Sequence, residues 1–187
     1  MHSSLSSVSP RTRWPDYIYP YVKNDRIFQC PSANPELFRK SFAHNPGSFY
    51  GGYGYNYQYL GNNRFPFSAP DALVQAPAST VVITDTFGCG FDAGIRNAGN
   101  YIIDPPLPSA RGSRPGGTDN QYYGAGWECG GAWGCRAVPA ERHQDRINVA
   151  YCDGHVKTLK LSQLDDFNGD GVRDNGYFNG MGDAAAR

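Results

Sequence analysis

Residues 147–161 have the sequence INVAYCDGHVKTLKL. Ile147, Val149 and Tyr151 alternate with smaller or polar residues, which is the pattern of a β-strand that buries one face. An Asp-Gly pair follows, and a second run begins at Val156. Because Asp-Gly between two alternating runs is a strong hairpin signal, this stretch predicts the main antiparallel hairpin of the fold.

The register of this hairpin depends on the length of its loop. A two-residue loop would place Ile147 opposite Lys160. A three-residue loop that includes His155 would instead place Ile147 opposite Leu161 and gather the apolar residues on one face. We therefore expect the second register.

Two further elements are predicted upstream of the hairpin. Residues 80–84 form a β-branched run that ends at Asp85 and predicts a buried strand. Apolar residues recur at near-helical spacing over residues 14–22, and Pro15 suits the first position of a helix. This segment therefore predicts a short helix that is kinked or ends near Pro20.

Loops dominate the rest of the chain, since 23 glycines and 14 prolines exceed average usage. Residues 35–59 predict an ordered loop with a short strand, and residues 88–140 predict a long insertion rich in Gly and Pro. The length suits one domain. We expect a single α+β domain over residues 14–187, with a short N-terminal helix packed on a small antiparallel sheet, and a flexible N-terminus over residues 1–13.

Charge and hydropathy exclude two classes of partner. Seventeen basic residues balance 17 acidic ones without a Lys or Arg cluster, so we expect no nucleic-acid binding. No stretch is apolar enough to span a bilayer. The Ser-rich opening lacks the apolar centre of a signal peptide, so the sequence as given carries no export signal.

The five cysteines form no C-x-x-C pair, which argues against a structural zinc site. Cys129 and Cys135 flank a Gly-rich turn that would let their sulfurs meet in a disulfide. Reduced, buried cysteines are the alternative, and the sequence does not separate the two. The full set is Cys30, Cys89, Cys129, Cys135 and Cys152.

The strongest chemical signal is the segment 166–174, DFNGDGVRD, which fits the calcium pattern D-x-N-x-D-G-x-x-D. Calcium takes six to eight oxygen ligands, and alternate positions of a tight loop project side chains toward one centre. Gly171 permits the sharp turn. The predicted calcium ligands are Asp166, Asn168, Asp170, the carbonyl of Val172, and Asp174 either directly or through water.

Position twelve of this loop is Tyr177 rather than the usual bidentate Glu, so a further ligand must come from Asp165, Asp183 or solvent. The competing interpretation is that Asn-Gly and Asp-Gly simply form two turns. Turns alone do not require carboxylates at positions one, five and nine together. We therefore expect Ca²⁺ as the bound ion.

Several motifs together carry a family resemblance. His143 is followed after nine residues by Asp153-Gly154, and this pattern resembles the H-x9-DG motif of prepilin-type, pseudopilin-like proteins of planctomycete-type bacteria. The segment 28–32, FQCPS, resembles the exit from that family's long N-terminal helix. Residues 53–56, YGYN, and the strand ending at Asp85 also match.

The resemblance implies a helix on a small antiparallel sheet, with loops and often a metal at the exposed rim. One departure from the family matters. The prepilin cleavage site and the apolar anchoring helix are absent before Trp14. The chain would then be either a head domain of a longer gene or a soluble derivative, and in neither case would it polymerise through that helix.

Two functions from different classes are compatible with these features. The resemblance implies a calcium-binding, soluble head domain that contacts pilin-like or secretion proteins, outside the cytoplasm or at the cell surface. The alternative is a calcium-dependent hydrolase whose open calcium position polarises the carbonyl of a small ester or lactone, such as an acyl-homoserine lactone. The aromatic segment 53–59 would then receive the acyl chain.

The candidate catalytic residues of that alternative are His143, Asp153 and His155. A structural role, in which His143 bonds to loop carbonyls, is the competing interpretation. Cys152 lies close to His155 in sequence, but the alternation of side chains along a strand argues against a Cys-His nucleophile. The sequence has no G-x-S-x-G, phosphate-binding or H-E-x-x-H motif, so the commonest hydrolase and nucleotide classes are excluded.

Overall fold

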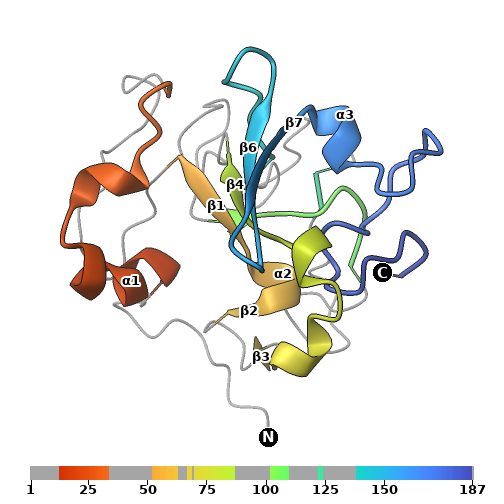
Figure 1. Ribbon diagram of the computed structural model, residues 1–187, viewed down its shortest axis with the longest axis horizontal. Helices are drawn as coiled ribbons and strands as arrows, with labels where there is room; N and C mark the ends of the chain where they lie inside the picture. Colours follow the sequence, from red (N-terminus) through yellow and green to blue (C-terminus); the bar gives the residue numbers. More distant parts are fainter. Residues whose placement is uncertain are drawn as a thin grey trace, which may run out of the picture.

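The computed structural model describes residues 13–33, 52–62, 67–68, 70–86, 102–109, 122–123 and 138–186 (Figure 1). Its helices are α1 (Trp14–Val22), α2 (Tyr57–Leu60) and α3 (Leu161–Leu164), with 3₁₀ turns η1 (Asp25–Phe28), η2 (Asp71–Leu73) and η3 (Pro77–Ser79). Its strands are β1 (Tyr53–Asn56), β2 (Gly61–Asn62), β3 (Phe67–Ser68), β4 (Val81–Asp85), β5 (Ile102–Ile103), β6 (Ile147–Tyr151) and β7 (Val156–Leu159). The α+β class predicted from the sequence is confirmed.

The main sheet has five strands in the order β5-β1-β4-β6-β7. Its pairings are antiparallel except for β1 with β5, so the sheet is mixed rather than purely antiparallel as expected. Gly54 makes the parallel pairing possible, because a Cβ at this position would lie 2.4 Å from the carbonyl oxygen of Ile102. A side chain on Gly54 would therefore push β5 away.

The core forms on one face of β6, as the alternating pattern predicts. Ile147, Val149 and Tyr151 are buried, and they belong to the same cluster as Val81 of β4. The C-terminal segment also joins this cluster through Phe178. The last fifty residues therefore both supply β6, next to the central strand β4, and help to cover the core on its face.

The hairpin forms at the expected place, but the predicted register is wrong. Ile147 pairs with Leu159, rather than with Leu161. The loop does contain three residues, but it lies between Tyr151 and His155, so it begins one residue earlier than expected. The physical reason is that Gly154 has φ +92°, and in a three-residue loop this left-handed residue occupies the last position.

The N-terminal helix begins at the expected place and extends through Pro20 to Val22, with Lys23 in a left-handed conformation after it. The backbone N–H of Arg13 donates to Asp16, so the chain is held from residue 13. The helix lies beside the sheet in Figure 1, and its Trp14 ring contacts buried Phe28 of η1 edge to face. In the described part of the chain, no helix is long and apolar enough to cross a membrane.

Several predictions concern residues outside the described part of the chain. Residues 1–12 of the predicted flexible N-terminus and residues 35–51 of the predicted loop lie there. The predicted Cys129–Cys135 disulfide lies there entirely, together with Cys89. The long insertion is described only at residues 102–109, 122–123 and 138–140. Of the described cysteines, Cys30 and Cys152 are both free.

Candidate functional site

The segment 166–174 follows α3 and forms a tight loop around one carboxylate. Asp166 accepts backbone N–H bonds from Gly169 at 2.8 Å, Asp170 at 3.0 Å and Gly171 at 2.9 Å. Gly169 and Gly171 have φ of +74° and +85°, in the left-handed region that favours glycine. The two glycines of the motif therefore allow the loop to wrap around its first residue.

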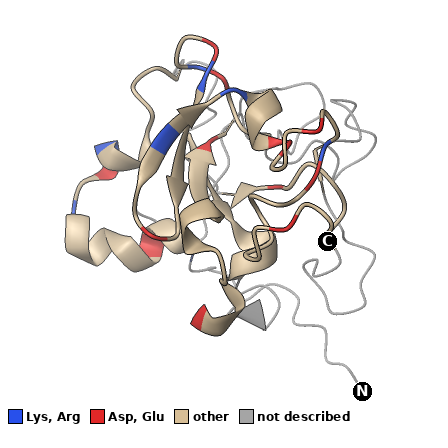
Figure 2. Ribbon diagram, turned by 45° about the vertical axis from the view of Figure 1, so that its right-hand side comes forward, with Lys and Arg blue, Asp and Glu red and all other residues tan. Residues whose placement is uncertain are grey.

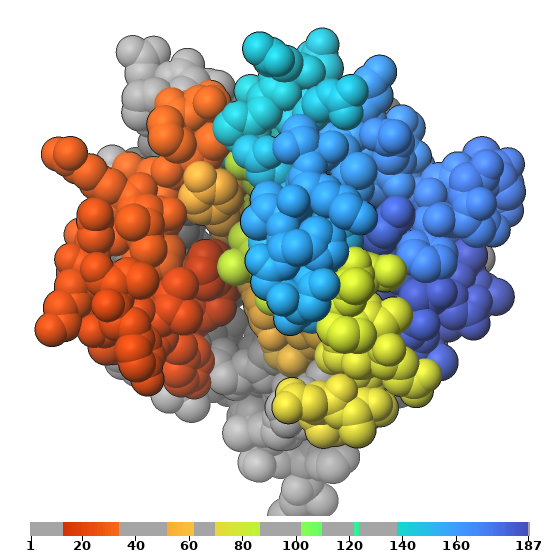
Figure 3. All heavy atoms as spheres, viewed as in Figure 1, coloured from red at the N-terminus to blue at the C-terminus, as the bar shows by residue number. Residues whose placement is uncertain are grey.

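Asn168 and Asp170 lie at the exposed tip of this loop. The Asn168 amide donates to Asp170 Oδ2 at 2.9 Å, and the other Asp170 oxygen accepts the N–H of Val172 at 2.7 Å. Each carboxylate oxygen keeps a second lone pair, so these bonds leave acceptor capacity for a cation. Figure 3 shows the blue C-terminal segment projecting from the right-hand edge of the molecule.

Asp174 has a different place from the other predicted ligands. It is 6% exposed, and its two oxygens accept the N–H groups of Phe167 at 2.9 Å and Gly176 at 2.7 Å. Its own N–H donates to the carbonyl of Asp165 at 2.7 Å. Asp174 therefore closes the base of the loop, while Asp166 lies at its centre and Asn168 and Asp170 form its tip.

Neither of the two proposed supplementary carboxylates is free of other bonds. Asp165 accepts a hydrogen bond from the hydroxyl of Tyr123 and lies 3.3 Å from Arg173 Nε. Burial raises the pKa of Asp165 to about 6, against the opposing effects of Tyr123 and Arg173. Asp183 accepts the N–H of Ala185 at 2.9 Å and so stabilises a turn.

The chemistry of this loop fits calcium. Asp166, Asn168, Asp170 and the carbonyl of Val172 offer only oxygen donors, which a hard cation prefers. Figure 2 shows acidic positions along the C-terminal segment that follows α3. The five predicted residues thus lie in one loop, in which Asp166 and Asp174 accept backbone N–H groups and Asn168 and Asp170 are exposed.

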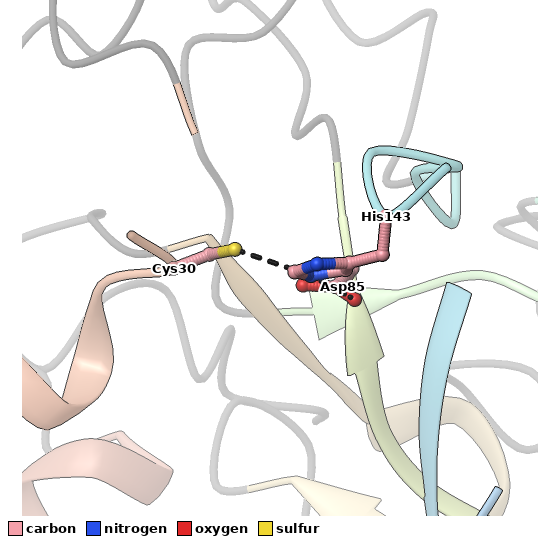
Figure 4. A group of neighbouring side chains, drawn as sticks. All are labelled: Cys30, Asp85 and His143. Carbon is pink, nitrogen blue, oxygen red and sulfur yellow. Dashed lines mark hydrogen bonds and ion pairs between the residues drawn. The ribbon is translucent and has the colours of Figure 1, made fainter. Parts of the chain in front are cut away.

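A second cluster joins three segments that are far apart in the sequence. His143 Nε2 lies 3.4 Å from Cys30 Sγ and 3.2 Å from Asp85 Oδ2 (Figure 4). Cys30 follows η1, Asp85 ends β4, and His143 lies in the loop before β6. Cys30 is 3% exposed and Asp85 is fully buried, whereas the His143 side chain is 25% exposed.

Groups around this cluster hold it in place. Asp85 Oδ2 also accepts the N–H of Asn148 at 3.0 Å. Arg142 donates to the carbonyls of Gly52 and Thr86, which flank the end of the sheet.

The cluster also affects a neighbouring tyrosine. Burial, followed by the negative charges of Cys30 and Asp85, raises the pKa of Tyr53 to about 12.

The candidate catalytic residues do not form one site. His155 Nδ1 lies 2.6 Å from Asp153 Oδ1 in the hairpin turn, and the His155 ring stacks on Tyr151 at 4.3 Å. His143 precedes β6, whereas this pair follows it, so the length of the strand separates them. A strand advances about 3.3 Å per residue, which puts roughly 13 Å between the two ends of β6.

The cluster of Cys30, Asp85 and His143 was missed by sequence reasoning about catalysis, which paired His143 with His155 instead. Periodicity and spacing give no signal for it, because Cys30 and His143 are 113 residues apart. All three residues nevertheless belong to the motifs that carry the family resemblance. The expectation that these motifs lie together in the fold would therefore have been the one way to find the cluster from the sequence.

No protein-family model matches the chain, and comparisons with curated proteins and with solved structures likewise find no match.

Proposed function

We propose that this protein is a calcium-binding, pseudopilin-like head domain that makes protein contacts outside the cytoplasm, at the cell surface or in a secretion assembly. The observation that carries the proposal is the arrangement of the C-terminal loop. Its backbone is already wrapped around Asp166, with Asn168 and Asp170 at the exposed tip. Little backbone entropy then remains to be lost when an ion binds, which favours affinity.

The loop is also connected to the core, which gives the ion a structural role. Asn175, directly after the loop, donates to Tyr59 Oη at 3.0 Å. The same side chain bonds both the N–H and the carbonyl of Leu107. Calcium at the loop would therefore stabilise the junction between the C-terminal segment, α2 and the chain after β5.

The surface of α1 supports a contact-making role. Tyr17 is 61% exposed and Tyr21 is 87% exposed, and Ile18 and Val22 on the same helix are also exposed. Figure 3 shows the segment that carries α1 and η1, in red and orange, at the left-hand edge of the molecule. Exposed apolar side chains that gather on one element are typical of interaction surfaces.

The competing hypothesis is a calcium-dependent hydrolase acting on a small ester or lactone. The separation of His143 from His155 and Asp153 disfavours it, since an acid–base mechanism needs its groups within reach of one substrate. The direct comparison is ring opening of a short-chain and a long-chain acyl lactone, with calcium and with chelator. We expect background rates in every case, and calcium-dependent turnover would replace the binding-domain proposal.

Calorimetric titration tests the calcium proposal itself. The wild-type protein should bind one Ca²⁺. It should bind Mg²⁺ much more weakly, because calcium accepts longer and more variable ligand distances than magnesium does. Asp170→Asn removes a charge from the tip and should weaken binding, whereas Asp71→Asn, at an exposed carboxylate on η2, should not. Equal calcium affinity in both variants, or no binding by the wild-type protein, would overturn the proposal.

A further inference from the structure

The cluster of Cys30, Asp85 and His143 presents three different metal-binding atoms to one point. The cysteine sulfur, one carboxylate oxygen and one imidazole nitrogen all lie within 4.8 Å of one another. Among the described residues, no other group of three His, Cys or acidic side chains has its ligand atoms this close together. Figure 4 shows the three side chains approaching from three separate segments of the chain.

The distances agree with those of a tetrahedral metal site. Zinc binds sulfur at about 2.3 Å and nitrogen or oxygen at about 2.0–2.1 Å, so tetrahedral geometry separates S from N by about 3.5 Å and N from O by about 3.3 Å. The corresponding separations are 3.4 Å for Cys30 Sγ to His143 Nε2 and 3.2 Å for Asp85 Oδ2 to the same nitrogen. These two separations match the tetrahedral values closely, and the third, from the cysteine sulfur to the carboxylate oxygen, is within 4.8 Å.

The same geometry argues against a nucleophilic Cys-His-Asp triad. In a triad the acid orients the imidazole through one nitrogen while the nucleophile contacts the other. Here Asp85 and Cys30 both approach Nε2 of His143. Because both acidic groups lie at the same ring nitrogen, the three side chains are arranged as ligands around one point and not as the linear series of hydrogen bonds that a triad requires.

Burial and charge supply an independent reason for a cation. Asp85 is fully buried, and its Oδ1 has no hydrogen-bond partner among the described residues. A buried carboxylate oxygen without a partner is costly, because desolvation of a charge must be compensated. Cys30 as a thiolate and Asp85 as a carboxylate would together balance the two positive charges of a divalent ion.

We propose that Cys30, Asp85 and His143 bind Zn²⁺. A sulfur, nitrogen and oxygen set suits this borderline-soft ion and does not suit calcium, which takes oxygen ligands. Three protein ligands leave the fourth position for water or another group, the arrangement found in catalytic rather than structural zinc sites. This site is separate from the calcium loop and does not depend on it.

The test titrates Zn²⁺ into the metal-free full chain against a chromophoric chelator. Cys30→Ser, Asp85→Asn and His143→Gln each remove or weaken one ligand, and Cys152→Ser and His155→Gln are matched controls. Loss of groups that merely orient a ligand weakens metal binding about 10–100-fold, so loss of a ligand should weaken it at least 100-fold. We expect one tightly bound Zn²⁺ in the wild-type protein and in both controls.

Two further measurements keep the outcome decisive. Near-ultraviolet circular dichroism establishes that each variant is folded, and Asp85→Asn retains the oxygen that accepts the N–H of Asn148. Cobalt bound in place of zinc should give a thiolate-to-cobalt charge-transfer band, and this band should disappear in Cys30→Ser. If a variant unfolds, the presence or absence of the band in the wild-type protein decides whether Cys30 is a ligand. A wild-type cobalt complex without that band, or unchanged zinc affinity in folded His143→Gln, would overturn the proposal.

Discussion

Gly54→Ala should destabilise the fold by forcing β5 away from β1. The new Cβ would lie 2.4 Å from the Ile102 carbonyl oxygen and 2.5 Å from a methyl carbon of Ile103, whereas ordinary carbon–oxygen contacts exceed about 3.3 Å. Because Ile102 presents backbone, a side-chain rotation cannot relieve the overlap. Overpacking costs about 1–3 kcal/mol, and each lost ladder bond costs about 0.5–1.5 kcal/mol. The reduced entropy of the unfolded chain offsets about 0.4–1 kcal/mol.

The net expectation is a loss of about 2–4 kcal/mol, or a fall of about 5–15 °C in the unfolding midpoint for a chain of this length. Urea unfolding followed by circular dichroism measures it. Gly154→Ala is the control, since that position has φ +92° but nothing within 4 Å of a Cβ. Its left-handed strain alone should cost about 1 kcal/mol. Gly54→Ala with wild-type stability, or less destabilising than Gly154→Ala, would refute the assigned pairing of β1 with β5.

Three individual side chains are expected to contribute to stability. Asn175→Ala should lower the free energy of unfolding by about 2–4 kcal/mol, because it leaves two backbone groups of Leu107 unpaired; wild-type stability would contradict the contact. Asp174→Asn should lower stability in chelator as well as in calcium, because this carboxylate closes the loop through backbone bonds; an effect seen only in calcium would instead make it a ligand. The bond from the His155 N–H lowers the pKa of Asp153, so its stabilising effect is present above about pH 4 and is lost as the pH falls further. Urea titrations of wild type and Asp153→Asn should therefore converge in acid, and a constant difference would contradict this.

Much of the fold is predictable because local chemistry and tertiary packing agree in the hairpin and in β4. The alternation of Ile147, Val149 and Tyr151 predicts their burial. The register was not predictable, because Asp153-Gly154 fits both a two-residue loop and the last positions of a three-residue loop. The parallel pairing of β5 was also hidden, since a two-residue strand carries no periodicity.

The two candidate sites differ in how far the sequence predicts them. The calcium loop is contiguous, so its ligand types and glycines appear at fixed spacing from Asp166. Even there, the role of Asp174 at the base of the loop depends on contacts that the pattern does not contain. The cluster of Cys30, Asp85 and His143 forms only when three segments fold together, so no local rule predicts it.

Linkage between calcium and stability tests the central claim most directly. The free energy of unfolding is measured in calcium-selective chelator and again with free calcium at one hundred times the calorimetric dissociation constant. An ion that binds only the folded loop should add about 2.7 kcal/mol at that concentration. Magnesium at the same concentration should add much less, and Asp170→Asn should lose most of the gain. An unfolding free energy that is the same in chelator and in calcium would contradict calcium binding by residues 166–174.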